Sequence, residues 1–231
     1  MKSIFGWGRA AFLIVALCLS TVSATAQQSS SAQYAIKDDD GERVANFDLT
    51  PGLADGVAKL AAQVPVGNLQ GDVTLLQFYD LNCPYCREAA RDVDTLVRAD
   101  KKLKLVLVPY AVLSVQSVQG ALIEVGASRS LTPEQYLDFH KRIYAGRGLI
   151  DGPRVLAAAT EFGLDKDKLA AVSNTEATLN LLRGNADFGT EAKLGVTPAY
   201  IVGGVVILGH PGLKALQAVV KSMRACGKVV C

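Results

Sequence analysis

Two short apolar runs flank a helical pattern between residues 72 and 109, and this arrangement constrains the fold more than any other feature of the chain. The first run, 72–79, follows a glycine and has the length of a buried strand. From 84 to 98, apolar residues recur at helical spacing with charged residues between them. The second run, 102–109, ends at a proline. Strand, helix and strand in this order predict the crossover of a parallel pair, because parallel strands need a long connection.

The order of the remaining elements predicts the fold class. Residues 115–194 are mostly helical in pattern. Two apolar runs joined by Gly203 and Gly204 follow, and this dipeptide is a signal for a tight hairpin. A last helix is expected over 212–223. The complete order predicts an α/β chain with a thioredoxin-like fold and an inserted helical domain.

Two helix starts in the helical block carry capping residues. Thr132 is the expected N-cap of one helix, with Pro133 in its first turn and Gln135 completing a capping box. A later helix is expected to be capped by Asn174.

The first 26 residues have the pattern of a secretory signal peptide. Lys2 and Arg9 supply positive charge, and the apolar stretch 10–20 is too short to cross a bilayer comfortably. Small residues precede the expected cleavage before Gln27. An uncleaved membrane anchor is the alternative. Export to the periplasm or to the outside is expected, where disulfides persist.

Removal of this segment changes the composition of the mature chain. The five cysteines become four because Cys18 is lost. The 24 basic residues become 22, against 22 acidic residues, because Lys2 and Arg9 are lost. A formally neutral chain gives no reason to expect nucleic acid or an anionic membrane as a partner.

The segment that follows the signal is expected to contribute little to the core. Residues 27–43 are polar, lack periodicity and are predicted to form a mobile leader. Pro51 is expected to start a helix. The apolar face of this helix would consist of Leu53, Val57, Leu60 and Val64. Such a face must pack on the core or on a second subunit, so the helix could mediate a homo-oligomer.

The stretch from Cys83 to Cys86, with Pro84 and Tyr85 between, lies where a strand is expected to end and a helix to begin. The free N–H groups and the macrodipole of a helix start stabilise an anion, so we expect a reactive Cys83 thiolate with a lowered pKa. Pro84 suits the first turn because its missing N–H is not needed there. The spacing places Cys86 within reach of Cys83 as a resolving thiol. Arg87 either supports the thiolate or is a solvated helix charge.

Two segments resemble the DsbA-like family of thiol–disulfide oxidoreductases. Residues 71–89, GDVTLLQFYDLNCPYCREA, are similar to its strand and active-site helix, and residues 194–209, LGVTPAYIVGGVVILG, are similar to its cis-proline loop and hairpin. The resemblance covers about 65–225. Two motifs in the right order are more specific than the cysteine motif alone, which glutaredoxins also carry.

The resemblance implies roles for individual residues. Cys83 would be the attacking nucleophile and Cys86 the resolver. Pro198 would be the cis-proline, and with Thr197 it would dock an extended substrate beside Cys83. Protein thiols and disulfides would be the substrates, and a membrane protein or a thioredoxin-like donor would be the redox partner. No cofactor and no metal are expected.

The sequence departs from the family pattern at two supporting positions. Gln77 stands where many members have a buried glutamate, and Asp80 either substitutes for it or is a polar residue at a strand end. Tyr85 brings no positive charge beside the thiolate. We therefore expect a reduction potential between roughly −270 mV and roughly −120 mV. The direction of electron flow stays open between an oxidase and an isomerase or reductase.

Cys226 and Cys231 are expected to form a local structural disulfide after the last helix. Two other classes of function remain open. All four cysteines of the mature chain could instead bind zinc in a structural protein, or the fold could serve as a binding protein without turnover. His140 is expected to be a satisfied helix-face histidine, and His210 could cap the last helix or contact substrate.

These patterns divide the chain into six consecutive parts. They are a signal peptide (1–26), a leader with a helix (27–64), the first thioredoxin-like part (65–114), the helical insertion (115–194), the second thioredoxin-like part (195–225) and a tail (226–231).

Overall fold

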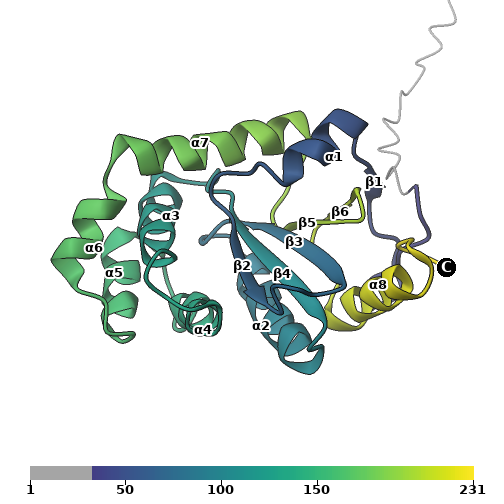
Figure 1. Ribbon diagram of the computed structural model, residues 1–231, viewed down its shortest axis with the longest axis horizontal. Helices are drawn as coiled ribbons and strands as arrows, with labels where there is room; N and C mark the ends of the chain where they lie inside the picture. Colours follow the sequence, from purple (N-terminus) through teal and green to yellow (C-terminus); the bar gives the residue numbers. More distant parts are fainter. Residues whose placement is uncertain (1–32) are drawn as a thin grey trace, which may run out of the picture.

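The computed structural model describes residues 33–231, so the expected signal peptide lies outside the described residues. A six-stranded sheet in the order β1-β6-β5-β3-β4-β2 forms its centre (Figure 1). The strands are β1 (Asn46–Asp48), β2 (Val64–Gly67), β3 (Val73–Tyr79), β4 (Leu103–Pro109), β5 (Ala199–Val202) and β6 (Val205–Leu208). The predicted thioredoxin-like fold with a helical insertion is confirmed.

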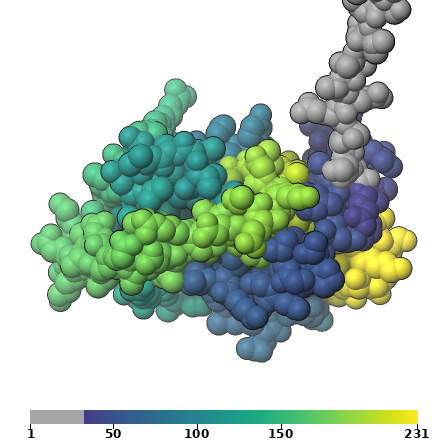
Figure 2. Space-filling model, turned by 90° about the horizontal axis from the view of Figure 1, so that it is seen from above, coloured from purple at the N-terminus to yellow at the C-terminus, as the bar shows by residue number. Residues whose placement is uncertain are grey.

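Helices cover both faces of the sheet and form a lobe beside it (Figure 1). They are α1 (Pro51–Val57), α2 (Pro84–Ala99), α3 (Val115–Ala127), α4 (Pro133–Ile143), α5 (Gly152–Thr160), α6 (Lys166–Ser173), α7 (Glu176–Glu191) and α8 (Leu213–Cys226). Figure 2 shows α7 as a green band that crosses from the lobe to the sheet. Over 33–231, no helix has both the length and the apolar character needed to cross a bilayer.

The sheet, with β3 among its central strands, divides the core into two layers. Leu75 and Tyr79 pack with α2 and α8 on one face, whereas Leu76 and Phe78 pack with α7 on the other. Side chains alternate between the faces of a strand, so the continuous apolar run is explained by burial on both sides. The strand β3 pairs with β4 in parallel, as the sequence predicts, and with β5 in antiparallel.

The hairpin between β5 and β6 is also confirmed. Its two turn residues, Gly203 and Gly204, have φ angles of 56° and 80°. A two-residue turn that matches the twist of the strands requires positive φ at both positions, which glycine adopts without steric cost. The hairpin places β6 where it can accept a further strand from the start of the chain.

That further strand is β1, and the residues before it correct the expectation of a mobile leader over 27–43. Asn46 pairs with Ile207 in an antiparallel ladder, and Lys37 and Arg43 form an isolated bridge before it. Asn46 is fully buried, and its amide donates to the backbone carbonyls of Tyr34 and Val44. The described part of the leader is therefore folded onto the sheet edge.

The predicted helix after Pro51 is shorter than expected. It ends at Val57, and Val64 instead begins β2, opposite Leu107 of β4. Leu53 and Val57 pack in the same apolar cluster as Phe188 of α7. The apolar face of α1 is thus used within the chain, and homo-oligomerisation through this helix has no structural support.

The helical block from α3 to α7 occupies 115–191. The capping box of Thr132 and Gln135 at the start of α4 is confirmed. The expected cap at Asn174 is wrong, because the Thr175 side chain accepts the hydrogen bond at the start of α7 while Asn174 ends α6. The sequence analysis also missed α6, a short helix of two turns.

The leader supplies the cap of the last helix. Gly212 has no side chain to cap α8, and the Asp39 carboxylate accepts from the backbone N–H groups of Lys214 and Ala215 at 3.2 and 2.8 Å instead.

We expect Asp39→Ala to lower the free energy of unfolding by about 1 kcal/mol, as loss of an N-cap does. Urea unfolding measures this. Asp40→Ala, next to it and exposed, is the control and should change stability by less than about 0.5 kcal/mol. Equal effects would contradict the capping role.

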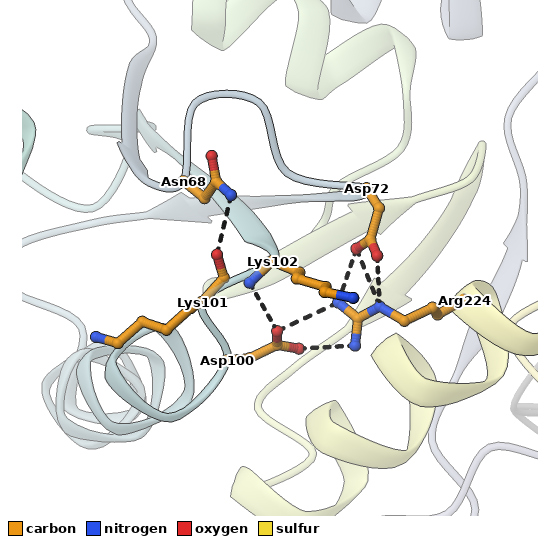
Figure 3. A network of polar contacts seen from close by, with 6 residues as sticks. All are labelled: Asn68, Asp72, Asp100, Lys101, Lys102 and Arg224. Carbon is orange, nitrogen blue, oxygen red and sulfur yellow. Dashed lines mark hydrogen bonds and ion pairs between the residues drawn. The ribbon is translucent and has the colours of Figure 1, made fainter.

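An ion-pair network lies at the end of the sheet where β3 begins and α2 ends (Figure 3). Arg224 of α8 binds Asp72, before β3, and Asp100, after α2, at 2.8 and 3.0 Å. The hydrogen bond from Arg224 lowers the pKa of the Asp72 carboxyl. The network ties three elements together, although such partly exposed pairs contribute little to stability.

Candidate active site

Cys83 and Cys86 lie at the junction of β3 and α2. Cys83 is the N-cap residue of α2, and Cys86 lies in its first turn. Both are free thiols with low exposure, 5% for Cys83 and 1% for Cys86. The fold brings the second motif to the same place, because the sulfur of Cys83 lies 3.0 Å from the carbonyl oxygen of Thr197. The peptide bond between Thr197 and Pro198 is cis.

The surroundings of Cys83 favour its ionised form. A hydrogen bond from the Cys86 thiol lowers the pKa of Cys83 to about 6, against the opposing effect of burial. The side chain of Thr197 and the backbone N–H groups of Cys86 and Tyr85 add to this lowering. The helix start therefore presents donors to the sulfur, as expected for a stabilised thiolate.

Cys86 has the opposite character. Burial raises the pKa of the Cys86 thiol far above its ordinary value, and the hydrogen bond and charge of Cys83 raise it further. One thiol is thus ionised at neutral pH and the other keeps its proton. This division suits a nucleophile with a resolving partner, because only the resolving thiol must lose a proton during the reaction.

Alkylation of the reduced protein should follow the lowered pKa of Cys83. The rate with iodoacetamide should rise with pH through about 6 and then level off, because only the thiolate reacts. Mass spectrometry after rapid quenching identifies Cys83 as the labelled residue. The control is the protein in denaturant, where the midpoint should move to about 8.5. A midpoint of about 8.5 in the folded protein would contradict a stabilised thiolate.

Asp80 is buried and its hydrogen bonds are all within the fold. One carboxylate oxygen accepts from the N–H groups of Val112 and Leu113, both at 2.9 Å. The other accepts from the N–H of Asn82 at 2.8 Å and from the Ser117 hydroxyl at 2.6 Å. These contacts favour the interpretation of Asp80 as a strand-end residue that holds the loop before α3 against the cysteines.

Asn82 is a site residue that the sequence analysis missed. Its amide oxygen accepts from the Ile150 N–H at 2.8 Å, and its amide nitrogen donates to the Ile150 carbonyl and to Ser117. The loop before α5 is thereby fixed beside Cys83. The position directly before the motif was the only signal for Asn82 in the sequence.

Gln77 begins a buried chain of hydrogen bonds. Its side-chain nitrogen lies 3.5 Å from the hydroxyl of Tyr200, its partner across β3 and β5. The Tyr200 hydroxyl lies 2.8 Å from Nδ1 of His210, and Nε2 of His210 lies 2.9 Å from the Asp92 carboxylate on α2. His210 is therefore part of an internal network, which differs from both roles expected for it.

Arg87 adopts neither of its two expected roles. Its guanidinium donates to the backbone carbonyls of Tyr144 and Gly146 and lies over the Tyr144 ring, 5.7 Å from the centroid. It joins the start of α2 to the end of α4. These partners could not be predicted from the sequence, because they depend on how the two helices pack.

His140 is satisfied on its helix, as expected, and its partner is a buried carboxylate. Its Nδ1 lies 2.9 Å from Glu124 of α3, and the Tyr79 hydroxyl donates to the other Glu124 oxygen at 3.0 Å. Glu124 and His140 have 0% and 1% exposure. This cluster holds the helical lobe to β3.

The tail cysteines, Cys226 and Cys231, are bonded to each other as a disulfide. Their sulfurs are therefore not ligands of a shared zinc ion with Cys83 and Cys86. In the described part of the chain, no group of three or more metal-ligating side chains is close enough together to hold a metal ion.

Comparison with known proteins places this geometry among thioredoxin-like proteins. A family model described as Thioredoxin matches residues 59–222. A thioredoxin-like oxidoreductase from Silicibacter pomeroyi is 29% identical, with a TM-score of 0.64 over 71% of this chain and 94% of that one. No curated protein matches the sequence.

Two further solved structures share the fold at lower identity. A periplasmic thioredoxin-like protein from Salmonella enterica serovar Typhimurium is 23% identical, with a TM-score of 0.67 over 78% of this chain and 99% of that one. The thiol–disulfide exchange protein alpha-DsbA2 from Wolbachia pipientis is 20% identical, with a TM-score of 0.66 over 74% of this chain and 93% of that one.

Proposed function

The chain belongs to the thioredoxin family, and on this premise we propose that it is an exported enzyme that forms or exchanges disulfides in other proteins. Its resemblance to the DsbA-like members is confirmed at the level of the fold. The observation that carries the proposal is the Cys83 thiolate. Its pKa of about 6 and its place at the helix start, beside Thr197, are the properties of an attacking thiol.

The two thiols divide the reaction between them. The Cys83 thiolate attacks a substrate disulfide, so a Cys83–substrate bond forms and the other substrate sulfur leaves as a thiolate. Cys86 then loses its proton and attacks the Cys83 sulfur. The Cys83–Cys86 disulfide forms and the second substrate thiolate departs. Run in reverse, the same steps transfer the disulfide to a reduced substrate.

Exposed apolar side chains around Cys83 support a protein substrate. They are Tyr85, Val112, Leu113, Val115, Leu149 and Val196. Val112 and Leu113 donate their N–H groups to Asp80, and Ile150, next to Leu149, donates to Asn82, so these residues are held beside the cysteine loop. An extended polypeptide can pack on such a surface while its sulfur reaches Cys83, and Thr197 and Pro198 would contact its backbone.

We place the enzyme in the periplasm or outside the cell, with a membrane protein or a thioredoxin-like donor as its redox partner. The expected signal at 1–26 and the periplasmic origin of the Salmonella structure support this location. The Cys83 pKa of about 6 lies between about 7 in thioredoxin and about 3.5 in DsbA. It therefore supports an intermediate reduction potential.

Insulin reduction by the mature protein with a small thiol as donor tests the activity. Turnover above the uncatalysed rate is expected, and turnover should be the same in a variant that carries both Cys226→Ser and Cys231→Ser. The tail disulfide lies on α8 and beyond it, and neither cysteine contacts the Cys83 site. A folded protein without turnover would remove the proposed function. Loss of turnover only in the tail variant would make the tail a redox relay.

A further inference from the structure

Resolution by Cys86 requires that its proton leave a buried site. Cys86 has 1% exposure, and burial, the largest cause of its raised pKa, does not depend on the charge of Cys83, so the proton is still present when the mixed disulfide has formed. The Cys86 side chain packs in the apolar layer between α2 and the sheet. Side chains that pass a proton on offer a route from such a layer to the surface.

Besides Cys83 and Thr197, which lie on the substrate side of Cys86, three buried groups interact with it: Asp80, Tyr144 and Tyr200. Asp80 already accepts four hydrogen bonds. The Tyr144 hydroxyl donates to the backbone carbonyl of Asp80, and a carbonyl cannot take up a proton at neutral pH. Tyr200 is the remaining group, and its hydroxyl leads to an imidazole.

Tyr200 faces the same layer as Cys86. It shares one apolar cluster with Cys83 and Cys86, and it pairs with Gln77 on the sheet face that α2 covers. Burial raises the pKa of the Tyr200 phenol, and charge at Cys86 is the second cause. Tyr200 therefore stays protonated, in the same buried layer as the resolving thiol.

The hydrogen bonds that link Gln77, Tyr200, His210 and Asp92 all run in one direction. Gln77 can only donate through its side-chain nitrogen, so the Tyr200 oxygen accepts there and its own proton points to His210 Nδ1. Nε2 of His210 then carries the other ring proton and donates to Asp92. Exposure rises along the chain, from 4% for the His210 side chain to 26% for that of Asp92.

We propose that Tyr200, His210 and Asp92 conduct the proton of Cys86 to the surface during resolution, an inference that rests on the proposed function. As Cys86 attacks, its proton moves to the Tyr200 oxygen while the Tyr200 proton moves to His210 Nδ1. The imidazolium that results is paired with the Asp92 carboxylate and loses a proton to water. The electron pair of Cys86 forms the bond to Cys83, and the substrate sulfur leaves with the pair of the broken bond.

A single-turnover reaction with the disulfide of 5-thio-2-nitrobenzoate separates the two thiols. The first release of the coloured thiolate reports attack by Cys83, and the second reports attack by Cys86. Tyr200→Phe should leave the first phase unchanged and slow the second about 10²-fold at neutral pH, a typical contribution of positioned proton transfer. Asp92→Asn should slow the second phase less, because it keeps a hydrogen-bond partner for His210.

Two controls separate proton transfer from disturbed packing. Tyr79→Phe removes the hydroxyl of another buried tyrosine on the same sheet face, one that binds Glu124 and not His210. Asp94→Asn changes a carboxylate of α2 that binds Arg98 and Lys141. Both should leave the second phase within twofold of wild type. The solvent deuterium isotope effect on that phase should be larger in wild type than in Tyr200→Phe.

The outcomes distinguish this proposal from the proposed function. If wild type shows no first phase, the proposed function fails. If wild type shows both phases but Tyr200→Phe resolves within twofold of it, the conducting role is overturned. The role is also overturned if Tyr79→Phe slows resolution as much as Tyr200→Phe does.

Discussion

Cys83→Ala is expected to abolish thiol–disulfide exchange, whereas Cys86→Ala is expected to react once and remain joined to its substrate. Without Cys83 there is no ionised sulfur at the helix start, because the Cys86 thiol is buried and its pKa is raised. Without Cys86, the mixed disulfide on Cys83 has no internal thiol to resolve it. Insulin reduction measures the first effect, and non-reducing gels with mass analysis measure the second.

Cys86→Ala, the variant that remains joined to its substrate, should also have a less acidic Cys83 thiol. The hydrogen bond from Cys86 is the largest cause of the lowered Cys83 pKa, so Cys86→Ala should raise that pKa. Cys86→Ser is the matched control, because it traps substrate equally but keeps a hydroxyl that can donate to the sulfur. Its pKa should lie below that of Cys86→Ala. Identical alkylation profiles for the two variants would contradict the hydrogen bond as the main cause.

His140→Ala should be strongly destabilising. It leaves the Glu124 carboxyl, which has 0% exposure, with the Tyr79 hydroxyl as its hydrogen-bond partner. Loss of a buried hydrogen-bond partner costs about 1–3 kcal/mol, and the cavity left by the imidazole ring adds to this cost. Urea unfolding of the reduced protein gives the change in the free energy of unfolding.

The same helix offers a control for this prediction. Arg142 of α4 forms an ion pair with Glu161, and both side chains are about half exposed. Arg142→Ala should therefore cost at most about 1 kcal/mol. If His140→Ala is no more destabilising than Arg142→Ala, the buried cluster does not hold the helical lobe to the sheet.

Local patterns in the sequence predicted the elements that depend on local chemistry. The β3-α2-β4 crossover, the glycine hairpin and the Thr132 capping box each follow from residues adjacent in the chain. The strands β1 and β2 have only three and four residues and, unlike the equally short β5 and β6, no glycine turn between them that marks a hairpin. They exist because β6 and β4 offer free edges, which is a property of the tertiary structure.

The same distinction applies to the site. Cys83 and Cys86 are recognisable from their spacing and from the helix that follows them. His210 and Asp92 lie far apart in the sequence and meet only through the packing of the loop after β6 against α2. Single histidines and aspartates carry no signal for such a pairing, and for this reason the buried network was missed.

The pairing of β1 with β6 joins the first and the last strand of the described residues. The edge of the sheet and the cap of α8 both need residues from the leader, so the domain can close only after its last elements have been made. Pairing across such a sequence separation is slow, because a long loop must close first. A nascent chain of this design remains open while it is being synthesised. Delayed closure of this kind would suit the export proposed above, because a chain that is still open can pass through a translocation pore.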